Sequence, residues 1–280
     1  MKLITKKRVL NWFSIAALIA MPMILVLSFL IQSSIIDILF VDDFSDIPAS
    51  EVETAKDTMI SQLLDWNYYH IYSNMFTPLF YPLFATLPVL FLTNENHDYM
   101  AFEFVRTRRY KSTVINKCLK YSLLSGVIMM VGYWIFISIG ALLNLKSPEY
   151  DCGMLMDFIP NLMNEKPIVG GLVHGITVYF PFGFIFGLFA AGVAINTRKS
   201  YLTILVPHIY YLLVGNILSA FYNTTNNYLL QQLSPWHPVT ITGQSYAAWY
   251  TTYYSLIPIL IISLLLIAWR LKNESKVSSQ

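Results

Sequence analysis

The chain has 280 residues, of which 56% are hydrophobic and 12% are Asp, Glu, Lys or Arg. A soluble domain has about 25% charged residues, so this composition predicts an integral membrane protein. The formal net charge is +2, which excludes the strongly basic balance typical of nucleic-acid-binding proteins. We therefore expect membrane lipid, and no nucleic acid, among its partners.

Five long stretches of the chain lack Asp, Glu, Lys and Arg, and the first four contain 28, 29, 25 and 31 residues. Each of these is long enough for one spanning helix, which needs about 20 apolar residues. The fifth stretch has 70 residues and contains a polar run at 223–227, so we divide it into two spans. The sequence thus predicts six transmembrane helices, near residues 12–36, 70–93, 121–145, 171–195, 200–221 and 253–270.

The basic residues predict the orientation, because Lys and Arg in short loops are retained in the cytoplasm. Fifteen of the 18 basic residues lie at the two termini, between spans two and three, or between spans four and five. We therefore expect both termini inside and a cytoplasmic segment at 94–118. The outer loops are then 37–69, 146–170 and 222–252. The predicted fold class is an all-α polytopic membrane protein, with one transmembrane domain over residues 1–280.

The second predicted span contains three prolines, Pro78, Pro82 and Pro88. A proline inside a helix removes a backbone donor and clashes with the preceding turn, so we expect this span to be bent or broken. A bent helix can line a transport pathway or act as a hinge. Membrane helices also tolerate proline without any such role, and both interpretations stay open.

The fourth predicted span carries two pairs of glycines at a spacing of four, Gly171 with Gly175 and Gly183 with Gly187. Small residues at this spacing allow two helices to approach closely. We expect these glycines to serve packing inside the bundle in preference to a dimer seam.

No predicted span places a charged residue at mid-bilayer, and no histidine motif of metal-binding spacing is present. We expect His174 and His208, which lie near span ends, to be interfacial or hydrogen-bonded within the bundle. The chain has no Walker A or G-x-S-x-G sequence. The sequence therefore predicts that the chain is not an enzyme and binds no metal or cofactor.

The outer connection at 222–252 contains no charged residue, although a loop of this length in water normally would. We expect it to enter the outer leaflet as short re-entrant helices, which is allowed where the backbone is buried in protein or lines a cavity. Pro235 and Pro238 should break these helices, and Trp236 should help to anchor them.

The cytoplasmic segment at 94–118 begins with acidic and aromatic residues and continues with basic ones. This order suits a short amphipathic helix, since acidic residues favour its N-terminal end and basic residues its C-terminal end. One interpretation is topology control and contact with anionic lipid. The mixed charge and the neighbouring phenylalanines also indicate a surface on which another protein docks.

These features together resemble the permease subunit of an ABC-2 type ABC transporter of the Gram-positive bacterial type. The resemblance is carried by the six spans with both ends inside, the coupling sequence EFVRTRRYKSTVINK, and the uncharged stretch with LSPWHP before the last span. It implies an exporter of amphipathic cargo (peptide, antibiotic or lipid-like) in the bacterial plasma membrane, in which two permeases, identical or homologous, pair with two ABC ATPase subunits. ATP and Mg would then bind the ATPase. The residues implied to contact the ATPase are Glu95, Tyr99, Phe102, Glu103, Phe104, Arg106, Arg108 and Arg109.

A different class of function remains open on the sequence alone. The chain could be a stand-alone polytopic membrane protein, either an intramembrane enzyme or an immunity or sensor protein. An intramembrane enzyme needs convergent polar catalytic residues, and the sequence reveals no such set. An adjacent gene for an ATPase would separate these interpretations, because a permease requires one.

Overall fold

The computed structural model describes residues 11–40, 48, 50–93, 110–147, 162–197, 199–240 and 249–277. These parts of the chain fold almost entirely as helices, which confirms the predicted all-α class. Five helical stretches are long and apolar enough to cross a membrane, and a bent pair of helices supplies a sixth crossing if it is counted as one span. The five are Trp12–Gln32, Lys111–Leu142, Pro167–Asn196, Ser200–Thr225 and Tyr250–Lys272.

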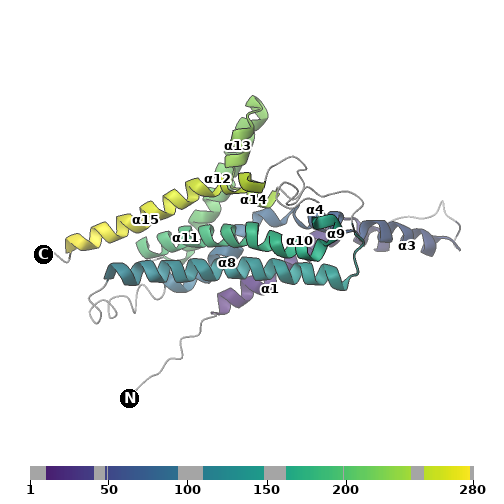
Figure 1. The fold of residues 1–280 in the computed structure, drawn as a ribbon, viewed down its shortest axis with the longest axis horizontal. Helices are drawn as coiled ribbons and strands as arrows, with labels where there is room; N and C mark the ends of the chain where they lie inside the picture. The colour runs from purple at the N-terminus through teal and green to yellow at the C-terminus, as the bar shows by residue number, and fades with distance from the viewer. Residues whose placement is uncertain are drawn as a thin grey trace, which may run out of the picture.

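The first span is α1 (Trp12–Gln32). The polar residue before it, Asn11, connects this span to the second span. Asn11 is the N-cap of α1, where its side chain accepts from the backbone N–H of Ser14 at 2.7 Å. The same side chain donates through Nδ2 to the carbonyl oxygen of Pro88 at 3.1 Å. Two short helices follow, α2 (Ile35–Phe40) and α3 (Val52–Leu63). Helix α3 has no buried residue and extends away from the bundle (Figure 1).

The second span is a series of short helical pieces instead of one continuous helix. It consists of α4 (Trp66–Ser73), the 3-10 turn η1 (Thr77–Leu79), α5 (Tyr81–Thr86) and the 3-10 turn η2 (Leu87–Val89). The pieces Trp66–Ser73 and Thr77–Thr93 meet at an angle of 44°. The span therefore begins before the expected residue 70 and is broken between Ser73 and Thr77.

The third and fourth spans form the centre of the bundle. Helix α8 (Tyr110–Leu142) has 33 residues, which at 1.5 Å per residue gives about 50 Å, against about 30 Å for a bilayer core. It begins at Tyr110, inside the stretch expected to be a cytoplasmic loop. The fourth span runs through α10 (Pro167–His174), the π-helix η3 (Gly175–Tyr179) and α11 (Phe180–Asn196), and the short α9 (Leu162–Glu165) precedes it.

The last part of the chain surrounds this centre. Helix α12 (Ser200–Thr225) is followed by α13 (Tyr228–Leu233), α14 (His237–Thr240), the 3-10 helix η5 (Trp249–Tyr253) and α15 (Leu256–Val277). The end of α12 and α13 project from the body of the bundle, whereas α15 runs alongside α11 (Figure 1). Each span has an apolar window of 18 residues. In the fourth span 78% of this window is buried, whereas in α12 only 17% is buried. Helix α11 is therefore the central element, and α12 lies at the edge.

The close contact between α8 and α11 depends on glycines. A Cβ placed on Gly183 would lie 2.8 Å from the carbonyl oxygen of Ser125, and one on Gly187 would lie 2.7 Å from the Cβ of Ser125. Gly171 and Gly175 meet α8 in the same way, at Ile137 and Trp134. These glycines pack within the chain, as the sequence predicted.

We expect Gly183→Ala to lower the stability of the bundle, because the new methyl group meets the backbone of α8, which cannot rotate away. Overpacking of this kind costs about 1–3 kcal/mol. Gly192→Ala is the matched control, since its Cβ would meet a side-chain atom of Leu266 at 3.1 Å and backbone only at 3.4 Å. The measurement is the Tm of each purified variant in detergent. Equal Tm values for the two variants would show that the α8–α11 contact tolerates a larger side chain.

Candidate functional site

The eight residues expected to contact an ATPase all lie between 94 and 109, outside the part of the chain that the structure describes. The described helices on either side of this segment nevertheless show where it is attached. It follows the end of the second span, where the hydroxyl groups of Thr93 and Thr203 form a buried hydrogen bond of 3.0 Å. It ends at Tyr110, where α8 begins. The segment therefore connects the broken second span, which is joined to α12, with the longest helix of the protein.

The three prolines of the second span each start a new helical piece. Pro78, Pro82 and Pro88 stand in the first turn of η1, α5 and η2, where a missing backbone N–H is tolerated. Pro82 and Pro88 are buried against the rest of the bundle. The expected bend is thus present, and it is made by separate short helices.

The uncharged stretch before the last span packs against the bundle in its described parts. Pro235 and Pro238 are buried. The indole of Trp236 lies directly against Gly215, leaving no room for a Cβ, and 6.3 Å from the ring of Tyr211. His237 Nε2 and the hydroxyl of Thr251 are 2.9 Å apart. These contacts fix α14 to the start of the last span and to α12.

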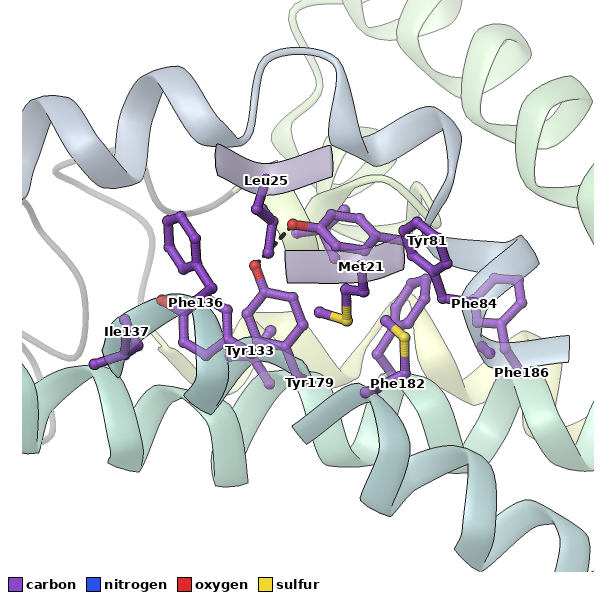
Figure 2. Packing of buried hydrophobic residues seen from close by; sticks show 14 of the residues in the cluster. Met21, Leu25, Tyr81, Phe84, Tyr133, Phe136, Ile137, Tyr179, Phe182 and Phe186 are labelled. Carbon is purple, nitrogen blue, oxygen red and sulfur yellow. Dashed lines mark hydrogen bonds between the residues drawn. The ribbon is translucent and has the colours of Figure 1, made fainter. Parts of the chain in front are cut away.

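At the centre of the bundle, polar groups of the broken second span meet polar groups of the fourth span, which contains a π-helix, in a network that no sequence pattern indicated. Asn74 lies in the break after α4, and its Oδ1 accepts from the hydroxyl of Tyr81 at 2.5 Å and from that of Tyr179 at 3.3 Å. The two phenol oxygens are 2.9 Å apart. Figure 2 shows the hydroxyl groups of Tyr81 and Tyr179 turned toward each other inside the apolar core. The break in the second span is therefore bonded to the π-helix of the fourth.

Aromatic rings extend this network toward α8. The ring of Tyr133 stacks on that of Tyr179 with centroids 4.0 Å apart, and its hydroxyl lies 3.1 Å from Nδ1 of His70. Tyr69 stacks on Phe136 of α8 at 4.2 Å and donates to the Phe136 carbonyl at 2.9 Å. Three spans thus contribute rings to one cluster, which we call the central polar cluster: His70, Asn74, Tyr81, Tyr133, His174 and Tyr179.

The environment of His174 differs from the sequence expectation of an interfacial or hydrogen-bonded ring. Its side chain is 2% exposed. Neither ring nitrogen has a hydrogen-bond partner within the described residues. His174 is the last residue of α10, and the π-helix begins directly after it.

The central polar cluster contains no Asp, Glu, Lys or Arg side chain. Among the described residues there is no group of three or more His, Cys, Asp or Glu side chains that would hold a metal ion. Phenols, an amide and imidazoles form directional hydrogen bonds, and buried polar groups require such partners. The arrangement is thus suited to holding the second and fourth spans in one relative position.

Comparison with known proteins does not extend this description: no family model matches the chain, and no curated protein or solved structure is detectably similar to it.

Asn74→Leu should destabilise the protein more than Tyr81→Phe. The first change removes the acceptor of both phenols and the Nδ2 donor to the His70 carbonyl, whereas the second leaves Tyr179 bonded to Asn74. A buried group that loses its partner costs about 1–3 kcal/mol, and a typical bond contributes about 1 kcal/mol. We expect losses toward the upper end for Asn74→Leu and near 1 kcal/mol for Tyr81→Phe, measured by unfolding in detergent.

The control for this series is Tyr211→Phe, because the Tyr211 hydroxyl is buried in the same core without a hydrogen-bond partner among the described residues. Removal of this hydroxyl should leave the stability unchanged or raise it slightly. An Asn74→Leu protein as stable as the Tyr211→Phe protein would contradict the role given to Asn74.

The stability should also depend on the protonation of His237, which lies outside the candidate spans. Burial lowers the pKa of His237 from 6.5 to about 4. Because the unfolded chain binds the proton more readily, stability contributed by the neutral ring is present above pH 6.5 and is lost as the pH falls toward 4. His237→Gln should remove up to about 3 kcal/mol of this loss, seen as a flatter dependence of Tm on pH. Parallel curves for the two proteins would contradict the assignment.

Proposed function

We propose that this chain is the membrane-spanning permease subunit of an ATP-driven ABC exporter, working with a separate ATPase. The observation that carries the proposal is the position of the segment at 94–109. It follows directly on a second span whose piece α5 packs against α1, α8, α11 and α12. Any protein that moves this segment therefore acts on four spans through one short helix.

The charge pattern supports the same function. The segment combines acidic, aromatic and basic residues, and the positive-inside rule assigns it to the cytoplasm, where an ATPase would bind it. Glu95, Tyr99, Phe102, Glu103, Phe104, Arg106, Arg108 and Arg109 are the proposed contacts. ATP and Mg would bind the ATPase, and two permeases would complete the transporter in the bacterial plasma membrane.

The proposed mechanism uses the breaks in the second span. Closure of the ATPase pair would push the segment at 94–109, and the push would reach α5 and the break at Asn74. Movement there changes how the second span packs on α12, to which the pair Thr93 and Thr203 ties it. The aromatic and apolar residues of these two spans suit amphipathic cargo such as a hydrophobic peptide, an antibiotic or a lipid-like molecule.

Affinity purification of the tagged full chain in mild detergent, followed by mass spectrometry, tests this proposal. We expect an ATPase with Walker motifs to be recovered with the chain, and to be lost when residues 99–109 are scrambled. The matched control scrambles the same number of residues at 53–63, which form most of α3 and have no buried side chain. Correct membrane insertion of both variants is verified by protease accessibility.

Two outcomes would overturn the proposal. One is recovery of the chain without an ATPase under conditions that keep a reference ABC complex intact, which would favour a stand-alone membrane protein. The other is full transport activity after Phe102→Ala combined with Glu103→Lys, since these changes remove an aromatic anchor and reverse a charge on the proposed contact surface.

A further inference from the structure

Two histidines of the central polar cluster have imidazole nitrogens that are buried without a hydrogen-bond partner among the described residues. These nitrogens are Nε2 of His70 and both Nδ1 and Nε2 of His174. The side chains of His70 and His174 are 0% and 2% exposed. A neutral imidazole has one N–H donor and one acceptor nitrogen, so this small region lacks partners of both kinds.

The two imidazoles lie around one phenol. The ring centroid of Tyr133 is 6.2 Å from that of His70 and 5.6 Å from that of His174. The hydroxyl of Tyr133 lies 3.1 Å from Nδ1 of His70. Rings from α4, α8 and α10 therefore lie beside one another in the protein interior, and two of these rings carry the unsatisfied nitrogens.

We propose that His70, Tyr133 and His174 form an internal hydration site, occupied by water that bridges the two imidazoles. Buried water is found where several polar groups have no other partner, and it makes about three hydrogen bonds. Water offers donors and acceptors together, which matches the neutral imidazoles. This site lies within one copy of the chain and is separate from the surface proposed to bind an ATPase.

Water fits this position better than a metal ion does. A cation would use only the acceptor nitrogens and would leave the N–H donors unsatisfied. Its charge would also be uncompensated, because the buried polar residues of the described chain include no Asp or Glu. A buried charge without a counterion is far less favourable than a buried neutral group.

The hydration site lies where the second and fourth spans both leave the regular α-helix. Helix α4 ends three residues after His70, and the π-helix Gly175–Tyr179 starts directly after His174. π-Helices and 3-10 turns often mark functional positions in helices. Asn74 Nδ2 donates to the His70 carbonyl at 2.9 Å, so the site adjoins the bonds that hold the break. Bridging water supplies a partner that can be exchanged when these segments move.

Radiolytic footprinting of the full chain tests the site directly, because hydroxyl radicals formed from bound water label side chains that bulk solvent does not reach. With the chain in lipid nanodiscs and ¹⁸O-labelled water, we expect several-fold more labelling of Tyr133, His70 and His174 than of Phe182 and Phe186. The two phenylalanines are the controls, since both are 0% exposed in the same core. Rates are divided by those of the unfolded protein, which corrects for intrinsic reactivity. Labelling equal to that of the phenylalanines would overturn the proposal.

A stability measurement gives an independent test through its sign. If water bridges the rings, His174→Leu removes bonded groups and the Tm falls. If the site is dry, the same change removes unsatisfied polar atoms from the core and the Tm rises, which would overturn the proposal. Metal analysis of the purified chain is run in parallel, and one equivalent of bound metal that is lost in His174→Leu would replace water with a cation as the ligand.

Discussion

The contact between α8 and α11 determines the geometry of everything at the centre of this protein. Gly183 and Gly187 allow α11 to approach the backbone of α8 at Ser125. This approach places Tyr179, one residue before α11, on the ring of Tyr133 at 4.0 Å. From there the phenol of Tyr179 reaches Tyr81 across the bundle. A helix–helix contact made by two glycines therefore also sets the position of the second span.

The second span differs from the other described spans because its helix is interrupted between Ser73 and Thr77. A break in a membrane helix leaves backbone carbonyl groups without partners, and lipid supplies none. Side chains of the break itself provide them: Asn74 donates to the carbonyl of His70 at 2.9 Å, and the hydroxyls of Ser73 and Thr77 donate to those of Tyr69 and Ser73. The break thus combines Pro78, which stands in the first turn of the next helical piece, with polar side chains that bond to the carbonyl groups of the preceding residues.

The sequence predicted the class and most of the spans, because absence of charge over about 20 residues is a direct consequence of bilayer thickness. It also predicted a disturbed second span from Pro78, Pro82 and Pro88. It did not predict the central polar cluster, since a search for charged residues passes over neutral phenols, amides and imidazoles. The meeting of Tyr81 with Tyr179 depends on two residues 98 positions apart, and no local pattern encodes that distance. A signal was nevertheless present in the polar side chains His70, Ser73, Asn74 and Thr77 within a predicted span.

The two kinds of contact at the centre differ in how they respond to force. The α8–α11 interface is close-packed, and a shift of even a fraction of an ångström creates clashes or voids. The second span is fixed by neutral hydrogen bonds, each of which contributes about 1 kcal/mol net and can be exchanged for a bond to another polar group or to water. Helices α8 and α11 therefore form the rigid frame, and the second span is the element that can change its packing. Under the proposed function, a push on residues 94–109 would act on the second span. Its short piece α5 could then transmit the push to the four spans that it contacts, and none of them would have to unfold.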